Sequence, residues 1–249
     1  MTTDTERPTT KDPAWMDDLV RAEPSAPLVI PYFAYLILLM ANDAVPTKYL
    51  PVAIAVHTVI GLYVVWMFRR RLPAMGRPYW GLAIVAGLLA ALGWVVGQHV
   101  LNGIHVGDYA LGDRLYLWPG ERKIVDPHET YGSGAWFASY ATMKIVRACT
   151  VVPIVEELFW RGFILRIFVS WNRPHQVPFG TFTWFSFLGS SLISTLQHPD
   201  NWGVSIGCWM FFNALFIWRR SFWLLTITHA VTNLALYLYV LRAGDWQFW

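Results

Sequence analysis

Two adjacent carboxylates and an arginine stand inside an otherwise apolar run. Glu156 and Glu157 are followed four residues later by Arg161, in a segment whose other side chains mostly suit lipid or a packed core. An ionisable group at membrane depth costs roughly 2.5–3.5 kcal/mol on insertion scales. Groups held at such a cost are usually paired, functional or both, so these residues predict polar partners elsewhere in the chain.

Helix geometry divides the three residues into two roles. Adjacent helical residues point about 100° apart, whereas residues four apart share a face. Glu157 and Arg161 are therefore expected to form a self-contained structural ion pair that positions the helix. Glu156 has no such partner, and an unpaired carboxylate in an apolar site can act as a general base near neutral pH.

Polar residues at a depth comparable to that of Glu156 occur on two later apolar segments. His198 ends one of them, and His229 and Asn233 lie four apart on the last one. One acid, two histidines and one carboxamide can activate a water and stabilise an oxyanion. Taken singly, each also fits a simpler role, as a helix-end residue or as an interhelical hydrogen-bonding group.

The composition is that of an integral membrane protein. Of 249 residues, 55% are hydrophobic and 14% are charged, against about 25% charged in soluble domains. We therefore expect an all-α fold, a multi-pass transmembrane bundle of about seven to eight helices. The net charge of +3 is small and gathers at segment ends, which indicates topology signals and no nucleic-acid partner.

The polar start and the apolar remainder divide the chain. Residues 1–27 are expected to be a cytosolic tail, with a short interfacial helix around Trp15 to Arg21. Residues 28–249 are expected to form a single polytopic membrane domain with a catalytic core at about 144–241. The expected apolar segments, the first interrupted early by Pro31, are 28–40, 50–68, 80–101, 152–171, 182–198, 204–218 and 222–241.

Basic clusters predict the orientation. Junctions near residues 70, 173 and 219 carry arginines, and alternation of the spans places all three on one side. The positive-inside rule makes that side cytoplasmic, with the N-terminus inside. Residues 135–151 are expected to form an amphipathic helix, interfacial or re-entrant, and whether they cross the membrane is left open. The Glu156 region then lies toward the outer half.

The order of these residues resembles a known family. Glu156-Glu157-x-x-x-Arg161, a histidine closing a later span, and His229-x-x-x-Asn233 are similar to the CPBP intramembrane proteases, the type II CAAX prenyl endopeptidase-like (Abi) proteins. The likeness covers about residues 144–241, and extends to the bacterial CAAX prenyl protease-related subgroup associated with exosortase systems. The family's middle motif is usually Phe-x-x-x-His; here it is Ser194-Thr195-Leu196-Gln197-His198, which keeps only the histidine.

This resemblance implies an enzyme that hydrolyses peptide bonds in the membrane. Glu156 and His198 would hold and deprotonate the attacking water, His229 and Asn233 would stabilise the oxyanion, and Glu157 with Arg161 would position the helix. No cofactor is expected, with a divalent metal such as zinc as the alternative. The implied partners are membrane lipid and a membrane-anchored protein or peptide substrate, in a bacterial inner (cytoplasmic) membrane.

Two other functions fit parts of the same pattern. One is a non-catalytic immunity or scaffold protein of the same fold. The other is a proton-coupled transporter in which Glu156 and the histidines relay protons. The transporter ranks lower, because the spans lack the paired broken helices of inverted-repeat transporters.

Overall fold

The computed structural model describes residues 12–115, 117 and 124–249. The expected cytosolic tail falls partly on residues 1–11, which lie outside the described residues. The helices are α1 (Ala14–Ala22), α2 (Ala26–Ala41), α3 (Leu50–Phe68), α4 (Trp80–Asn102), α5 (Pro127–Tyr131), α6 (Ala135–Cys149), α7 (Val151–Phe159), α8 (Leu165–Ile167), α9 (Trp184–Ile193), α10 (Trp202–Arg219) and α11 (Phe222–Ala243).

Shorter elements connect the helices. Strands β1 (His105–Val106) and β2 (Tyr109–Ala110) pair antiparallel in a small hairpin. A π-helical turn, η3 (Trp160–Ile164), joins α7 to α8. The 3-10 turns are η1 (Asn42–Ala44), η2 (Thr47–Tyr49), η4 (Pro174–Gln176), η5 (Ser194–Leu196), η6 (Pro199–Asn201) and η7 (Trp246–Phe248).

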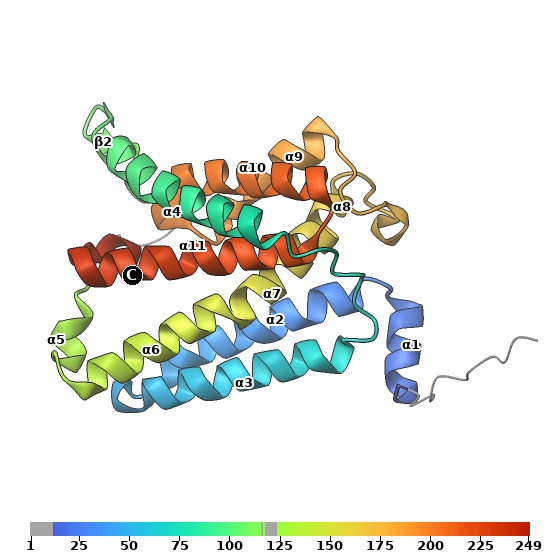
Figure 1. The fold of residues 1–249 in the computed structure, drawn as a ribbon, viewed down its shortest axis with the longest axis horizontal. Helices are drawn as coiled ribbons and strands as arrows, with labels where there is room; N and C mark the ends of the chain where they lie inside the picture. The colour runs from blue at the N-terminus through green and yellow to red at the C-terminus, as the bar shows by residue number, and fades with distance from the viewer. Residues whose placement is uncertain (1–11, 116, 118–123) are drawn as a thin grey trace, which may run out of the picture.

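The helices form two layers, and α4 is inclined to the other long helices (Figure 1). One layer holds α2, α3, α6 and α7; the other holds α4, α9, α10 and α11. Helix α11 joins the layers by packing against α6 and α7 on one side and α4 and α10 on the other. This arrangement confirms the predicted all-α bundle. It also brings the segment that carries Glu156 and Arg161 into contact with the helix that carries His229 and Asn233.

Four helices of the described chain are long and apolar enough to cross a membrane. They cover Ala26–Ala44, Thr47–Phe68, Trp80–Asn102 and Phe222–Ala243, and Trp184–Leu196 is a shorter apolar helix. Their bounds lie close to the predicted segments, but Pro31 does not interrupt α2, which continues through it. Proline at this position removes only the hydrogen bond to the Pro27 carbonyl, and packing against α3 and α7 holds the helix together.

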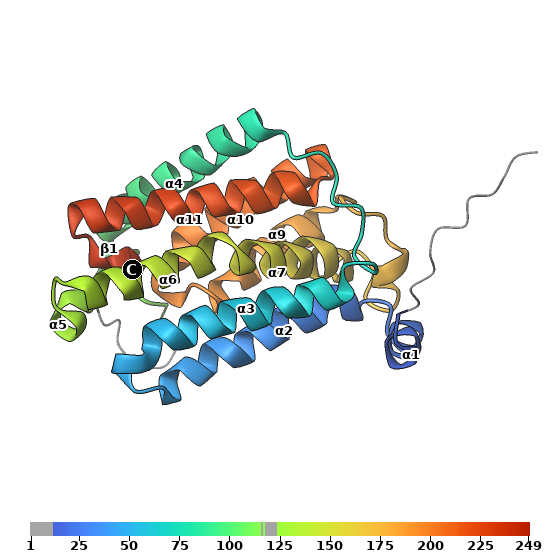
Figure 2. The same ribbon diagram turned by 60° about the horizontal axis from the view of Figure 1, so that its bottom comes forward.

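The helix predicted at residues 135–151 is present as α6, and it forms the first part of a longer rod. Helix α6 lies lengthwise between α3 and α11 and continues in line into α7 (Figures 1 and 2). The break between them falls at Thr150, with φ −119° and ψ −84°. Pro153 accounts for it, because proline has no N–H to donate to the Cys149 carbonyl and its ring clashes with that carbonyl.

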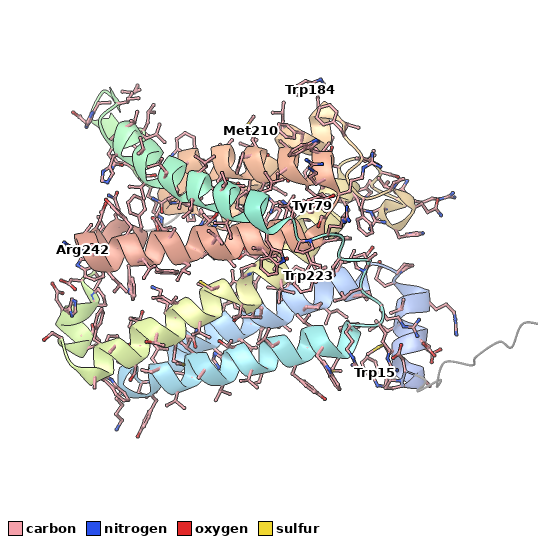
Figure 3. The ribbon with its side chains drawn as sticks, in the orientation of Figure 1. Trp15, Tyr79, Trp184, Met210, Trp223 and Arg242 are labelled. Atoms are coloured by element: carbon pink, nitrogen blue, oxygen red, sulfur yellow. The ribbon has the colours of Figure 1, made fainter. Side chains whose placement is uncertain are left out.

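All three basic junctions lie at one end of the bundle, here called the basic end (residues 69–79, 168–183 and 219–222). The Trp223 amide donates to the Met75 carbonyl at 2.9 Å, and Ser221 Oγ donates to the Arg77 carbonyl at 2.6 Å. Figure 3 shows Tyr79, Trp184 and Trp223 toward this end and Arg242 toward the other. The sequence therefore predicted correctly that the three basic junctions lie at the same end of the bundle.

The other end, here called the far end, gathers residues 42–49, 103–115, 197–201 and 244–249. The Leu115 amide donates to the Pro199 carbonyl at 3.1 Å, and Asn102 Nδ2 donates to Gln247 Oε1 at 3.1 Å. His99 Nε2 and Asp245 Oδ2 lie 2.9 Å apart. These contacts tie the hairpin region and the chain terminus to the turn that follows His198.

Close packing of α4 on α11 depends on one glycine. Thr232 Oγ1 donates to the Gly87 carbonyl at 3.1 Å. A Cβ atom at Gly87 would lie 2.6 Å from the Thr228 carbonyl and 2.7 Å from Val231 Cβ, whereas one at Gly81 would meet nothing within 4 Å. Since backbone and a β-branched side chain cannot move aside cheaply, Gly87 sets the separation of the two helices.

We expect Gly87→Val to destabilise the protein by about 1–3 kcal/mol, the usual cost of overpacking. The measurement is thermal unfolding of the purified protein in detergent. Gly81→Val is the matched control, because it adds the same side chain to the same helix in open space. Equal unfolding temperatures for the two variants would contradict the proposed role of Gly87.

Candidate active site

Helix α7 carries both glutamates immediately before the π-helical turn. Such turns insert one extra residue, are rare, and occur frequently at functional sites. Here the turn contains Arg161, while Glu156 and Glu157 lie on the preceding regular helix. Glu157 is 0% exposed and Arg161 is 1% exposed. Both charges are thus fully removed from solvent and must be satisfied inside the bundle.

Glu157 and Arg161 form the ion pair that their spacing predicts. Arg161 Nη1 lies 3.2 Å from Glu157 Oε2, and the guanidinium lies over the Trp209 ring at 4.0 Å from its centroid. The pair is not self-contained, however. His229 Nδ1 lies 2.9 Å from Glu157 Oε1, so a histidine from α11 completes a buried triad. Spacing within one helix does not predict this third member, because His229 comes from a different helix.

His229 connects the two glutamates. Its Nε2 faces Glu156, at 4.0 Å from Oε2. An ionised carboxylate only accepts hydrogen bonds, so Nδ1 must carry the hydrogen that meets Glu157. The lone pair of the neutral ring is then on Nε2, directed toward Glu156. This fixes both the orientation and the tautomer of His229.

Glu156, His198, His229 and Asn233 all line one cavity of about 340 Å³. Asn233 Nδ2 donates to the Ala148 carbonyl at 2.7 Å, which ties α11 to the end of α6. The His198 ring packs edge-on against Trp94, with 5.2 Å between centroids, and lies close enough to His229 to interact electrostatically. The tertiary structure therefore brings the four sequence-predicted residues together.

The partner predicted for Glu156 was His198, but the closest ionisable contact is His229. Within the described chain, His198 forms no ion pair with either glutamate. The Gln197 amide instead interacts with the Glu156 carboxylate. Gln197 was missed; its signal was its place beside His198, where η5 ends and the chain turns toward η6.

The cavity reaches the far end of the bundle. Asp200 and Asn201 from the turn after His198, and Trp246 and Trp249 from the chain terminus, contribute to its wall. These residues lie opposite the basic junctions. Within the described residues, no group of three or more His, Cys, Asp or Glu side chains is arranged to hold a metal ion, so the choice between metal-free and metal-assisted chemistry stays a prediction.

Residues 138–235 match the family described as Type II CAAX prenyl endopeptidase Rce1-like. This segment of the chain is similar to the Rce1-like family. The match lies within the predicted 144–241 region except at its start, and it includes every residue from Glu156 to Asn233, so the predicted resemblance is confirmed. No curated protein and no solved structure matches the chain. The long apolar helices and the similarity to this family both indicate that the chain is an integral membrane protein.

We expect Arg161→Leu to destabilise the protein by about 3–5 kcal/mol, because it leaves the buried Glu157 charge without its cation. Thermal unfolding in detergent measures the effect. Arg173→Leu, at an exposed position of the basic end, is the control and should stay within about 0.5 kcal/mol. Adding Glu157→Leu to Arg161→Leu should recover part of the loss. Similar stability of both arginine variants would show that the ion pair does not hold the fold.

Proposed function

We propose that the protein is an intramembrane endopeptidase that hydrolyses a peptide bond of a membrane-anchored protein or peptide. The observation that carries this proposal is the placement of His229 between two glutamates, with its free nitrogen directed into the cavity toward Glu156. A purely structural histidine would have both ring nitrogens satisfied by protein groups. Here one nitrogen is fixed and the other faces a carboxylate across a gap.

The gap suits a water molecule. Direct hydrogen bonds span about 2.7–3.2 Å, whereas Glu156 Oε2 and His229 Nε2 are 4.0 Å apart. One water can contact both atoms at once. In this arrangement Glu156 and His229 hold the water, and His229 has the role that the sequence predicted for His198.

The reaction then proceeds as follows. Glu156 accepts a proton from the water while the water oxygen bonds to the carbon of the scissile carbonyl group. The π electrons of that group move onto the carbonyl oxygen, which becomes the oxyanion. The tetrahedral species collapses, the C–N bond breaks, and Glu156 returns the proton to the leaving amine. The products are a carboxylic acid and an amine, and the acid then gives its proton to the amine to leave a carboxylate and an ammonium group. No external reactant besides water is required.

Two cavity residues can stabilise the oxyanion. The Asn233 amide uses one N–H for the Ala148 carbonyl, and the same NH₂ group holds a second hydrogen that can donate to the oxyanion. His198, which lines the same cavity and packs against Trp94, can donate from its ring. Preorganised donors of this kind typically contribute about 10²–10³-fold to the rate.

The position of the cavity indicates where the substrate is cut. If the basic end lies in the cytoplasm, as the positive-inside rule requires, the far end and the cavity face outward. We therefore propose a bacterial inner membrane protein with its N-terminus in the cytoplasm, which cuts its substrate near the outer face. That position argues against a cytosolic prenylated protein as the substrate.

We expect Glu156→Gln to lower the rate of cleavage of endogenous membrane peptides by at least about 10²-fold, because it removes the general base. His229→Ala should do the same. Mass spectrometry of membrane peptides from cells that express each variant at equal protein level provides the measurement. Glu129→Gln and His175→Ala, at exposed positions, are the matched controls. Retained biological activity with no change in peptides would favour the scaffold function.

Cysteine labelling tests the side on which the cavity opens. In a Cys149→Ala and Cys208→Ala background, we expect an impermeant maleimide added to intact cells to label Asn201→Cys, which lines the cavity. Arg173→Cys, at the basic end, should be labelled only in inverted vesicles. Labelling of Asn201→Cys from the cytoplasmic side alone would overturn the proposed orientation.

A further inference from the structure

A second charged group faces the cavity and takes no part in the mechanism above. Arg147, on α6, lines the same cavity as Glu156. Its Nη1 atom is buried and has no hydrogen-bond partner. Guanidinium groups inside proteins are normally paired with carboxylates or carbonyls. An unsatisfied guanidinium nitrogen beside a cavity therefore points to a ligand that satisfies it.

Acidic side chains share a cavity or pocket with Arg147, but none of them forms an ion pair with it in the described chain. Arg147 interacts electrostatically with Tyr35, His57 and Tyr237. None of these side chains carries a negative charge at neutral pH. Asp43 lines a neighbouring pocket together with Arg147, yet it lies beyond ion-pair distance. In the described chain, neither Arg147 nor Lys144 forms an ion pair. The Arg147 guanidinium thus has no direct carboxylate partner among the described residues.

Lys144, one turn earlier on α6, is placed differently. Its Nζ lies 4.4 Å from the centroid of the Trp249 ring, where a cation–π contact stabilises the ammonium. Lys144 lines the neighbouring pocket but not the cavity that holds Glu156. Of the two neighbouring cations, only Arg147 can meet a ligand that also reaches Glu156.

The distance between Arg147 and Glu156 suits a short stretch of peptide. The two residues are nine positions apart on the collinear rod of α6 and α7, which corresponds to roughly 13 Å at 1.5 Å per residue. An extended peptide advances about 3.3–3.6 Å per residue. A peptide bond placed at Glu156 thus puts a group three or four residues away at Arg147.

We propose that Arg147 is a specificity-determining residue that binds a carboxylate of the substrate, three or four residues from the bond that is cut. The planar guanidinium fork matches a carboxylate and binds it through two hydrogen bonds. The carboxylate belongs either to the end of the peptide or to an aspartate or glutamate side chain. This inference rests on the proposed endopeptidase function, and the two can fail separately.

The test uses three libraries of N-terminally palmitoylated peptides with the purified protein in detergent. The first has no acidic residue and a free terminal carboxylate, the second is the same with a terminal carboxamide, and the third is a carboxamide with one aspartate at varied positions. We expect the first or third to be cut roughly 10- to 100-fold faster than the second, the effect of one charge-assisted hydrogen-bonded pair. Which of the two is preferred identifies the source of the carboxylate.

Variants assign that preference to Arg147. Arg147→Gln should cut all three libraries at the rate that the wild type shows for the uncharged one, and Arg147→Lys should restore part of the preference. Lys144→Gln is the matched control and should behave like the wild type. Equal rates of the wild type on all three libraries, or an unchanged preference in Arg147→Gln, would overturn the inference while leaving the endopeptidase function intact.

Binding separates this inference from the chemistry. The Glu156→Gln variant should bind the preferred library more tightly than the uncharged one, and Glu156→Gln with Arg147→Gln should bind both alike. If the wild type cuts no library, the proposed function fails, while a carboxylate preference in binding still supports Arg147. If binding shows no preference, the role of Arg147 is refuted whatever the cleavage result.

Discussion

The structure depends on the burial of one carboxylate, Glu157, between a guanidinium and an imidazole. Its charge has no access to solvent, so the protein must supply every partner. Arg161 comes from the same helix and His229 from the last one. Losing Arg161 would leave the buried charge uncompensated, which costs several kcal/mol. Losing His229 would remove a buried hydrogen bond from the same carboxylate. The triad therefore joins α7 to α11 and, in doing so, determines which ring nitrogen of His229 faces Glu156.

Helix packing makes that triad possible. Gly87 allows α4 to approach α11 closely, and α11 is the helix that contacts both layers. Pro153 breaks the rod between α6 and α7, and the Ala148 carbonyl near that break accepts the hydrogen bond from Asn233. The glycine and the proline thus act on the site through backbone geometry and without contributing a functional group.

The cavity combines a negative and a positive region at separate depths. Glu156 and His229 lie at one place and Arg147 at another, with Tyr35 and Tyr237 interacting with both Glu156 and Arg147. In a low-dielectric bundle such charges act strongly over the distance of a few residues. A peptide whose scissile carbonyl lies at Glu156 and whose carboxylate binds Arg147 would be oriented before any bond is broken. Orientation of this kind is how binding energy lowers a reaction barrier.

The sequence by itself determined the features that depend on local geometry. Hydrophobic runs predicted α3 and α4 almost to the residue, and four-residue spacing predicted the Glu157–Arg161 pair, because both follow from the pitch of a single helix. Only the tertiary structure decided that His229 bonds to Glu157, that Gln197 approaches Glu156, and that α6 runs in line with α7. These outcomes depend on how each helix is rotated about its axis and packed against its neighbours. Contacts between distant segments set that rotation, and spacing along one segment contains no information about it.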